Sequence, residues 1–293
     1  MALDIVAKFL FPAPFPSYEE DSFPGELIWV PLIANGTLDY REANYSFPCL
    51  LLQCPCAKYL LLYFHRNAED LGMCRRFCDQ IKRLFNVHVL AIEYPGYGPR
   101  PGCAPSAGQA TKHAFAAYAF VRDVLHWPSD SILIFGCSVG TGLASVLAAQ
   151  EEVAGLVLVA PFLSIRAAAR DRMGGLISSL IPEMFPNELH ALMIRSPTLI
   201  VHGVMDQIVP CSHGIRLFDL LSCRKALVNP VEMSHNTCLL KQDNFLRRPM
   251  LDFFGLPEFS SDLLCVPPWA WRSPWALPVT GPWLFTSPKI PAP

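Results

Sequence analysis

The chain contains 293 residues, of which 52% are hydrophobic and 16% charged, and its formal net charge is −2. This length suits one large α/β core with tails, although two domains would also fit. Because no basic stripe appears, nucleic acid is excluded as an expected partner. The 11 cysteines are odd in number and lack zinc-type spacing, so we expect free thiols in a reducing, cytoplasmic compartment and neither a metal nor a cofactor.

Residues 1–24 form a lead-in before the first expected strand. Asp4 and Lys8 interrupt the apolar core that a secretory signal needs, so the segment is not expected to be one. Four apolar residues would share one side of a short helix, namely Leu3, Val6, Phe9 and Leu10. That side fits an interfacial membrane anchor, and it fits equally well a surface packed against the rest of the domain.

Strand and helix patterns alternate from residue 25 onward. Two early strands are expected at 25–32 and 47–53, and Asn35 and Gly36 are expected to form a hairpin turn. A helical pattern covers 107–125, and short apolar runs of the kind buried in parallel sheets occupy 59–65, 87–94, 131–135, 156–160 and 198–201. This alternation predicts the α/β class, with a mostly parallel sheet and helices on both of its faces.

The segment 131–142 runs from an apolar strand through Gly136-Cys137-Ser138-Val139-Gly140 into a small-residue helix. This order is typical of a nucleophile elbow, in which a serine lies on a tight strand-to-helix turn. Glycines are needed two residues on either side because side chains there would collide across the turn. The turn would lift the Ser138 hydroxyl clear of the sheet and aim the Val139 amide at a developing oxyanion. An ordinary glycine-rich turn is the alternative.

A serine nucleophile needs a base, and the base needs a carboxylate that orients it. Asp206 comes just after the apolar run 197–201, and His235 follows the run 225–231. Since catalytic groups gather at the carboxyl ends of parallel strands, these residues are expected to converge on Ser138. Ser138 would attack, His235 would take and return the proton, and Asp206 would fix the histidine tautomer. The alternative is a turn-capping Asp206 and a surface His235.

Two further segments depart from the sheet pattern. Residues 162–194 are apolar and helical in pattern, so they are expected to form a lid over an acyl pocket or to serve as scaffold packing. The proline density after residue 255 excludes a helical or strand period, so 256–293 is expected to be a disordered or polyproline-like tail. Its tryptophans suit a segment that binds a partner or a membrane interface. The expected folded domain therefore spans 25–255.

A family resemblance rests on five short motifs, which are Tyr63 to Gly72, Glu93 to Gly98, Gly136 to Gly142, His202 to Asp206, and Ser234 to Asn236. Through these motifs the chain resembles the α/β-hydrolases. More narrowly, it is similar to the Bem46-type and ABHD17-type depalmitoylase branch, which is often grouped with the serine aminopeptidase S33-like hydrolases. The resemblance implies an α/β-hydrolase fold with a short helical lid, and it implies catalytic roles for Ser138, Asp206 and His235.

The resemblance also places an oxyanion-hole amide at Asn67, in addition to that of Val139. Members of the family have His-Gly-Asn where this chain has His65-Arg66-Asn67. If the backbone at Arg66 needs a positive φ, we expect strain of about 1–3 kcal/mol or another loop shape, and a slower enzyme as the result. Otherwise the Arg66 guanidinium is expected to bind an anionic group of the substrate or to lie solvated on the surface.

Three functions from different classes are compatible with these patterns. The first is a serine hydrolase that cleaves an ester or thioester through an acyl-enzyme, and the resemblance implies depalmitoylation of a lipidated protein. Relatives attach to membranes through an N-terminal cysteine cluster, whereas this chain has no cysteine before Cys49, so any peripheral membrane contact is expected to be weak and reversible. The second function is an S33-like peptidase. The third is a non-catalytic hydrolase-fold scaffold, which the departure at Arg66 suggests.

Overall fold

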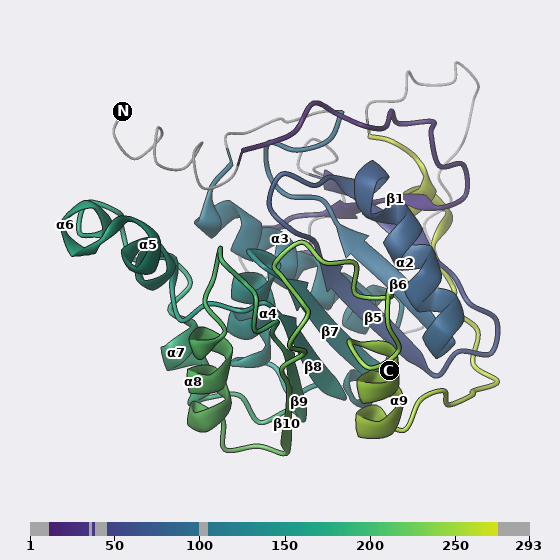
Figure 1. Cartoon of the computed structure of the whole chain (residues 1–293). Helices are drawn as coiled ribbons and strands as arrows, with labels where there is room; N and C mark the ends of the chain where they lie inside the picture. The colour runs from purple at the N-terminus through teal and green to yellow at the C-terminus, as the bar shows by residue number, and fades with distance from the viewer. Residues whose placement is uncertain (1–11, 35–36, 39–45, 100–104, 275–293) are drawn as a thin grey trace.

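The computed structural model describes residues 12–34, 37–38, 46–99 and 105–274. The apolar side expected between Leu3 and Leu10 and the turn residues Asn35 and Gly36 lie outside these ranges. A single eight-stranded sheet forms the centre of the described structure (Figure 1). Its strands are β1 (Leu27–Pro31), β4 (Ser46–Leu52), β5 (Tyr59–Phe64), β6 (Val87–Ile92), β7 (Ile132–Cys137), β8 (Gly155–Val159), β9 (Thr198–Val201) and β10 (Lys225–Val228).

The strands follow the order β1-β4-β6-β5-β7-β8-β9-β10 across the sheet. β1 pairs antiparallel with β4, and β4 with β6, while every neighbouring pair from β6 to β10 is parallel. A separate two-stranded ribbon, β2 (Ile33–Ala34) and β3 (Thr37–Leu38), pairs antiparallel on either side of the expected hairpin turn. The predicted α/β class with a mostly parallel sheet is therefore confirmed.

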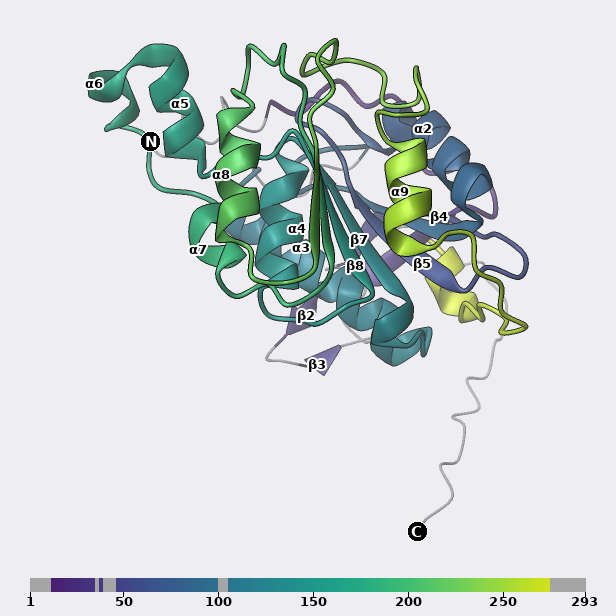
Figure 2. The same cartoon turned by 60° about the horizontal axis from the view of Figure 1, so that its bottom comes forward.

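Helices cover both faces of this sheet, as Figure 2 shows. One face carries α3 (Ala107–Ala119), α4 (Gly140–Ala148) and α8 (Ser212–Leu220), and the other carries α2 (Leu71–Phe85) and α9 (Arg247–Phe254). The remaining helical segments are α5 (Ile165–Met173), α6 (Gly175–Ser178), α7 (Asn187–Ala191), the π-helical turn η2 (Phe120–Val124) and the 3-10 turns η3 (Ser129–Ser131) and η4 (Pro268–Trp271).

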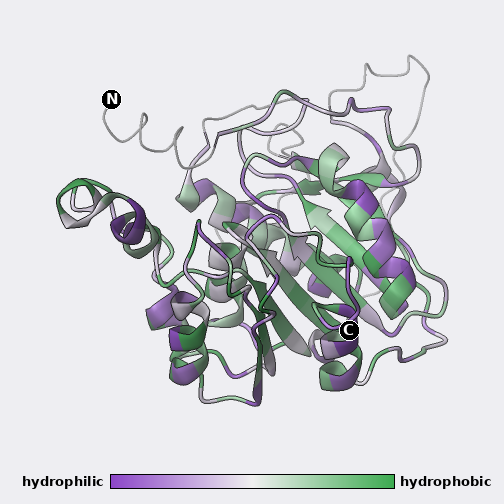
Figure 3. Ribbon diagram, in the orientation of Figure 1, coloured by the Kyte–Doolittle hydropathy of each residue, from purple (hydrophilic) through white to green (hydrophobic). Residues whose placement is uncertain are grey.

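Strand residues alternate between two buried layers. In β5, Leu62 and Phe64 pack under α3 and α4, whereas Leu61 and Tyr63 pack under α2. Because both layers exclude water, the strands read as continuous apolar runs rather than as alternating patterns. Figure 3 shows these hydrophobic strands enclosed by helices whose outer surfaces are mixed in polarity.

The described part of the lead-in is fastened to the domain at the start of α2. Asp70 caps this helix by accepting a hydrogen bond from the Met73 amide at 3.0 Å, and it accepts another from the Ser17 amide at 2.7 Å. The Tyr18 hydroxyl donates to the buried Glu93 carboxylate at 2.8 Å. Residues 12–24 are thus held by buried polar groups of the domain itself.

The first part of the C-terminal tail is docked on the domain. An isolated antiparallel bridge joins Phe259 to Ala57, and Glu258 forms an ion pair with Lys58. Further along, η4 lies against β1 and buries Ala270 completely. The sequence predicts disorder from residue 256, whereas the structure packs 256–274 and leaves 275–293 outside the described residues. Backbone pairing and a few buried side chains fix this segment without any helical or strand period.

The region expected to form a lid contains α5, α6 and α7. The Ser164 hydroxyl caps α5 by accepting a hydrogen bond from the Ala167 amide at 3.1 Å. Two side-chain contacts hold the region to the domain. Asn187 Nδ2 donates to the Phe162 carbonyl at 2.9 Å, and His213 Nε2 lies 2.6 Å from the Asp171 carboxylate. α5 and α6 themselves extend away from the sheet (Figures 1 and 2).

Candidate active site

Ser138 lies in the turn between β7 and α4 and has a left-handed backbone conformation, with a φ of 52°. A Cβ atom at Gly136 would lie 2.6 Å from the carbonyl oxygen of Gly140, and one at Gly140 would lie 2.2 Å from that of Phe64. Both glycines are therefore required by space alone. A positive φ at a non-glycine residue is strained, and strain of this kind collects at active sites. The local geometry is that of the predicted nucleophile elbow.

The structure brings together the three residues that the sequence singles out. The Ser138 Oγ lies 2.9 Å from His235 Nε2, and His235 Nδ1 lies 2.7 Å from Asp206 Oδ2. Asp206 follows β9 and His235 lies in the loop after β10, so both approach from the carboxyl edge of the parallel strands. Ser138 is partly exposed, whereas the other two side chains are buried. This series of hydrogen bonds is the geometry that activates a serine hydroxyl.

Asp206 is held in place by more than its contact with His235. Its Oδ1 accepts hydrogen bonds from the amides of Ile208 and Val209, both at 2.9 Å. Burial would raise the pKa of this carboxyl, but the hydrogen bonds from His202, His235 and the Val209 amide hold that pKa well below its usual range. Asp206 is therefore a fixed negative charge opposite the imidazole.

Sequence reasoning gave His202 no role. Its ring is fully buried, and Nε2 donates to the Val209 carbonyl at 2.9 Å while lying 3.3 Å from Asp206 Oδ2. Gly214 leaves room for it, because a Cβ there would lie 2.7 Å from His202 Nδ1. His202 therefore braces the loop that carries Asp206. The signal was present in the His202-Gly203-x-x-Asp206 motif, whose first residue lies four positions before the carboxylate.

A second buried network holds the loop after β5. The His65 ring stacks on Tyr94 with ring centroids 3.8 Å apart, and its Nε2 lies 3.4 Å from the Glu93 carboxylate. The Tyr94 hydroxyl donates to the His65 carbonyl at 2.7 Å, and the Tyr97 hydroxyl donates to Asn67 Oδ1 at 2.9 Å. These contacts fix the position of Asn67 beside the nucleophile.

Asn67 and Val139, the two residues expected to supply oxyanion donors, both line the cavity at Ser138. Val139 is the cap of α4, so its amide is one of the helix N-terminal amides that have no partner within the helix. The Arg66 amide donates to the Glu69 carboxylate at 3.1 Å, so it is already engaged. The next amide along this loop is that of Asn67.

The expectations for Arg66 need correction. Positive φ falls two residues later, at Ala68 with a φ of 55°, and Arg66 is absent from the described residues that have one. The hypothesis of backbone strain at Arg66 is therefore wrong, because the loop makes its tight turn at a different residue. The guanidinium Nε donates to the buried Cys137 Sγ at 3.0 Å, and Arg66 does not line the cavity over Ser138. The guanidinium therefore contacts the residue before Ser138 and not the cavity. The geometry supports neither of the other two expectations, a solvated surface arginine or a contact with an anionic substrate.

A cavity of about 450 Å³ opens above Ser138 and is bounded on one side by α5. Apolar side chains dominate its wall, and Arg172 is the single ionisable group among them. The lining residues are Asn67, Ser138, Val139, Phe162, Ile165, Ala168, Ala169, Arg172, Met173, Ile181, Ile208 and Val209. A wall of this composition suits a hydrocarbon chain.

The side of α5 that faces the cavity follows a helical repeat. Ile165, Ala168, Ala169, Arg172 and Met173 are spaced as i, i+3, i+4, i+7 and i+8, which places them on one face. The two alanines in the middle leave room for a ligand alongside the helix. Sequence reasoning identified the lid segment as apolar but did not resolve this face, although the spacing was legible.

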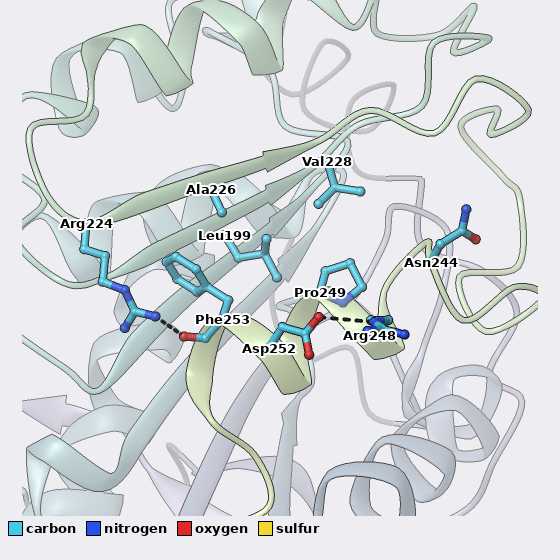
Figure 4. Close-up of a pocket in the computed structure, with 9 residues that line it drawn as sticks. All are labelled: Leu199, Arg224, Ala226, Val228, Asn244, Arg248, Pro249, Asp252 and Phe253. Atoms are coloured by element: carbon cyan, nitrogen blue, oxygen red, sulfur yellow. Dashed lines mark hydrogen bonds and ion pairs between the residues drawn. The ribbon is translucent and has the colours of Figure 1, made fainter.

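A second hollow, of about 370 Å³, lies beside β9, β10 and α9 (Figure 4). In it Arg224 covers the ring of Phe253 at 4.3 Å, and Arg248 pairs with Asp252 at 3.3 Å. Its wall contains no serine, cysteine or histidine that would act as nucleophile or base. Across the described ranges, no group of three or more His, Cys, Asp or Glu residues is arranged to hold a metal ion.

Comparison with known proteins shows that the chain is similar to α/β-hydrolases. Residues 55–191 match the family model described as serine aminopeptidase, S33. The α/β-hydrolase domain-containing protein aho-3 of Caenorhabditis elegans is 28% identical over 228 residues, which cover 73% of this chain and 68% of that protein. The human α/β-hydrolase domain-containing protein 17B is 33% identical over 173 residues. That match covers 58% of each chain, so this chain spans little more than half the length of the human relative.

Solved structures agree on the architecture. An esterase of Pyrococcus furiosus superimposes with a TM-score of 0.63 at 13% identity and covers 83% of this chain and 100% of its own. Mouse α/β-hydrolase domain-containing protein 10 superimposes with a TM-score of 0.53 at 14% identity and covers 72% of this chain and 94% of its own. At such identities the likeness shows the fold alone. The protein therefore has the α/β-hydrolase fold, and its predicted resemblance to the ABHD17-type branch is confirmed by the similarity to 17B and aho-3.

Proposed function

We propose that the protein is a serine hydrolase that cleaves an ester or thioester through an acyl-enzyme. The observation that carries the proposal is the series of hydrogen bonds from Ser138 through His235 to Asp206, at 2.9 and 2.7 Å, beneath an apolar cavity. A hydroxyl in this setting is a nucleophile at neutral pH, whereas a free serine is not. The hydrolase relatives support the broad class.

In the first half of the reaction His235 Nε2 accepts the Ser138 proton as Oγ bonds to the acyl carbon. The carbonyl oxygen becomes an oxyanion, for which the amides of Val139 and Asn67 are the proposed donors. Asp206 stabilises the imidazolium that results. When the intermediate collapses, His235 gives the proton to the departing alcohol or thiol and the acyl-enzyme remains. Water then repeats the sequence, with His235 as its base, and releases the carboxylic acid.

The substrate class follows from the cavity wall. Hydrocarbon fits a wall made of Ile165, Ala168, Phe162 and their neighbours, so the acyl group is a fatty chain. Together with the resemblance to the depalmitoylase branch, this wall supports a fatty acyl thioester on a protein as the substrate. A cytoplasmic location at a membrane surface is part of the same proposal. No helix in the described part of the chain is long and apolar enough to cross a bilayer.

A peptidase is the second candidate, because the matched family model is described as an aminopeptidase. An aminopeptidase holds the charged amino terminus of its substrate, and a carboxylate is the natural partner of that charge. The residues around the cavity include no Asp or Glu, and Arg172 would repel the amine. The cavity therefore favours an ester or thioester over a peptide.

Labelling with a fluorophosphonate probe tests the proposal. The wild-type chain should be labelled, Ser138→Ala should lose the label, and Ser261→Ala, a change at an exposed serine in the docked tail, should keep it. A panel of p-nitrophenyl esters, acyl thioesters and aminoacyl amides then separates the two hydrolase classes. Turnover of the amides alone would establish the peptidase. Absence of labelling in the wild-type chain would leave a non-catalytic scaffold.

A further inference from the structure

The tip of the lid exposes large apolar side chains. Leu176 is 90% exposed, Leu180 81%, Ile177 53% and Met173 39%. We call these four residues the lid tip; they lie on and beside α6, which stands away from the sheet (Figure 1) and is coloured as hydrophobic in Figure 3. Scattered exposed apolar residues are ordinary, but four that fall together within 173–180 indicate an interaction surface.

Positive charge lies next to the lid tip. Arg170 and Arg172 are exposed on α5, and no salt bridge is formed by either within the described ranges. The carboxylate between them, Asp171, lies 2.6 Å from His213 Nε2 and is 41% exposed. Glu183 faces Arg166 at 3.6 Å. The tip therefore combines apolar side chains with two exposed cations that form no salt bridge in the described ranges, which is the composition of segments that bind anionic lipid surfaces.

The lid tip is continuous with the cavity over Ser138. Met173 belongs to both, and Arg172, its neighbour at the end of α5, also lines the cavity. From Ile165 to Arg172 the helix advances by about 10 Å, so the cavity-facing side of α5 leads from the region of the nucleophile to the exposed tip. A hydrocarbon chain entering from a bilayer at the tip would find apolar wall along this path.

The other rim of the cavity is apolar as well. The loop that contributes Ile208 to the cavity also exposes Met205, which is 58% exposed. The Met205 amide donates to the Met233 carbonyl at 3.1 Å, and this joins the loop to the one that exposes Val231, 72% of which is open to solvent. Apolar side chains therefore border the cavity on both sides at the carboxyl edge of the sheet.

We propose that the lid tip, with Arg170 and Arg172, is a docking surface for a lipid bilayer that contains anionic headgroups, and that docking aligns the cavity with acyl chains held in that bilayer. A membrane fits better than a protein partner because the lid tip combines aliphatic side chains that can insert into a bilayer with flanking cations. Protein interfaces, in contrast, are enriched in aromatic residues, which the lid tip lacks. Docking is independent of catalysis, and only the gain in turnover at the bilayer rests on the proposed function.

Binding to vesicles is the primary test. The full chain should sediment with phosphatidylcholine vesicles that contain phosphatidylserine and much less with pure phosphatidylcholine, and added salt should weaken the binding. Replacing both exposed leucines, Leu176→Ser with Leu180→Ser, should lower the partition coefficient by about tenfold or more, since two apolar insertions are lost. Arg170→Gln should lower it by about fivefold, the contribution of one cation near an anionic surface.

Matched changes elsewhere on the chain serve as controls. Leu263→Ser alters a leucine that is 82% exposed in the docked tail, and Arg76→Gln alters an exposed arginine on α2. Neither should change the partition coefficient. Equal binding of the lid-tip variants and the wild-type chain would overturn the proposal, and so would equal binding to neutral and anionic vesicles. Concentration-dependent dimerisation that the two leucine changes abolish, without vesicle binding, would assign the surface to a second copy and overturn it as well.

Activity separates this inference from the proposed function. The paired leucine variant should hydrolyse a soluble short-chain p-nitrophenyl ester at the wild-type rate, because neither leucine lines the cavity. Its turnover of a long-chain thioester embedded in anionic vesicles should fall in proportion to binding. Loss of turnover on both substrates would refute the separation of docking from catalysis. Intact vesicle binding without any hydrolysis would refute the proposed function and leave the docking surface standing.

Discussion

Replacement of Asp206 by asparagine tests the site most sharply, because it keeps the shape of the side chain and removes its charge. Asp206 has hydrogen-bonding partners at both oxygens, with two backbone amides at Oδ1 and, at Oδ2, His235 at 2.7 Å and His202 at 3.3 Å. Asparagine has one oxygen and one NH₂ group. Its oxygen will face the two amides, because the opposite orientation would place the NH₂ group against two donors.

This orientation disables the base. The asparagine NH₂ then meets His235 Nδ1 at the position where a carboxylate oxygen lies 2.7 Å away in the structure. To avoid two facing donors, the imidazole must accept at Nδ1 and carry its proton on Nε2. That proton points at the Ser138 hydroxyl, which therefore has no acceptor for its own. A wrong tautomer of this kind lowers kcat by about 10⁴-fold, or about 5.5 kcal/mol in the barrier.

The assay is steady-state hydrolysis of a short p-nitrophenyl ester, compared with Asp123→Asn as a control at an exposed carboxylate on η2. The control should keep wild-type kcat. Adding His235→Ala to Asp206→Asn should cost little more than the first change alone, because the two residues act as one unit. A kcat for Asp206→Asn within about tenfold of wild type would refute the orienting role that we assign to Asp206.

The same variant has a signature in stability. Since the folded-state pKa of Asp206 lies below its unfolded value, the carboxylate stabilises the fold at pH values above the unfolded pKa of about 3.9. That contribution is lost as the pH falls through the folded value. Urea unfolding should therefore show the largest difference between wild type and Asp206→Asn near pH 7 and a smaller one below about pH 4. A difference that grows on acidification would contradict the direction of the shift.

Three further predictions address the surroundings of the site. Gly140→Ala should lose activity and lower the melting temperature, because the new Cβ would lie 2.2 Å from a backbone carbonyl of β5; a wild-type melting curve would argue against this elbow geometry. Tyr18→Phe should lower the free energy of unfolding by about 1.5–3 kcal/mol in urea titrations, since Glu93 loses a hydrogen bond to a charged group. Arg66→Gly should not raise turnover, because Arg66 carries no positive φ; we expect equal or lower kcat on neutral and anionic esters alike, and a selective loss on anionic esters would restore the substrate-contact hypothesis.

Much of the fold could be predicted from the sequence because the patterns that specify its strands and turns are local. Both faces of the sheet are buried, so the strands at 59–64 and 132–137 had to be continuously apolar, and such runs stand out in a sequence. The elbow was equally legible, because steric collision across the turn permits only glycine at 136 and 140. Because Asp206 and His235 each follow a strand of the parallel sheet, the topology alone predicted that both would lie near the serine.

What the sequence could not supply depends on contacts between distant segments. The backbone of Arg66 is set by how its loop meets Glu69 and Cys137, so a family pattern at one position did not predict which residue takes the positive φ. The docking of 256–274 depends on partners about two hundred positions earlier, which no period reveals. The face of α5 that lines the cavity follows an ordinary helical repeat, and only the neighbouring loops decide what it faces.

The docked tail has a consequence for how the chain is synthesised. β1 is an edge strand of the sheet, and the segment that lies against it, η4, is synthesised only after every strand of the sheet. Nearby, the Ser273 hydroxyl donates to the Glu20 carboxylate at 2.6 Å. This contact cannot form until Ser273 has been synthesised. Folding on the ribosome therefore leaves the first strand without its cover until Ser273 has emerged. A transcript that ends early would present this strand to other chains, since uncovered edges template aggregation.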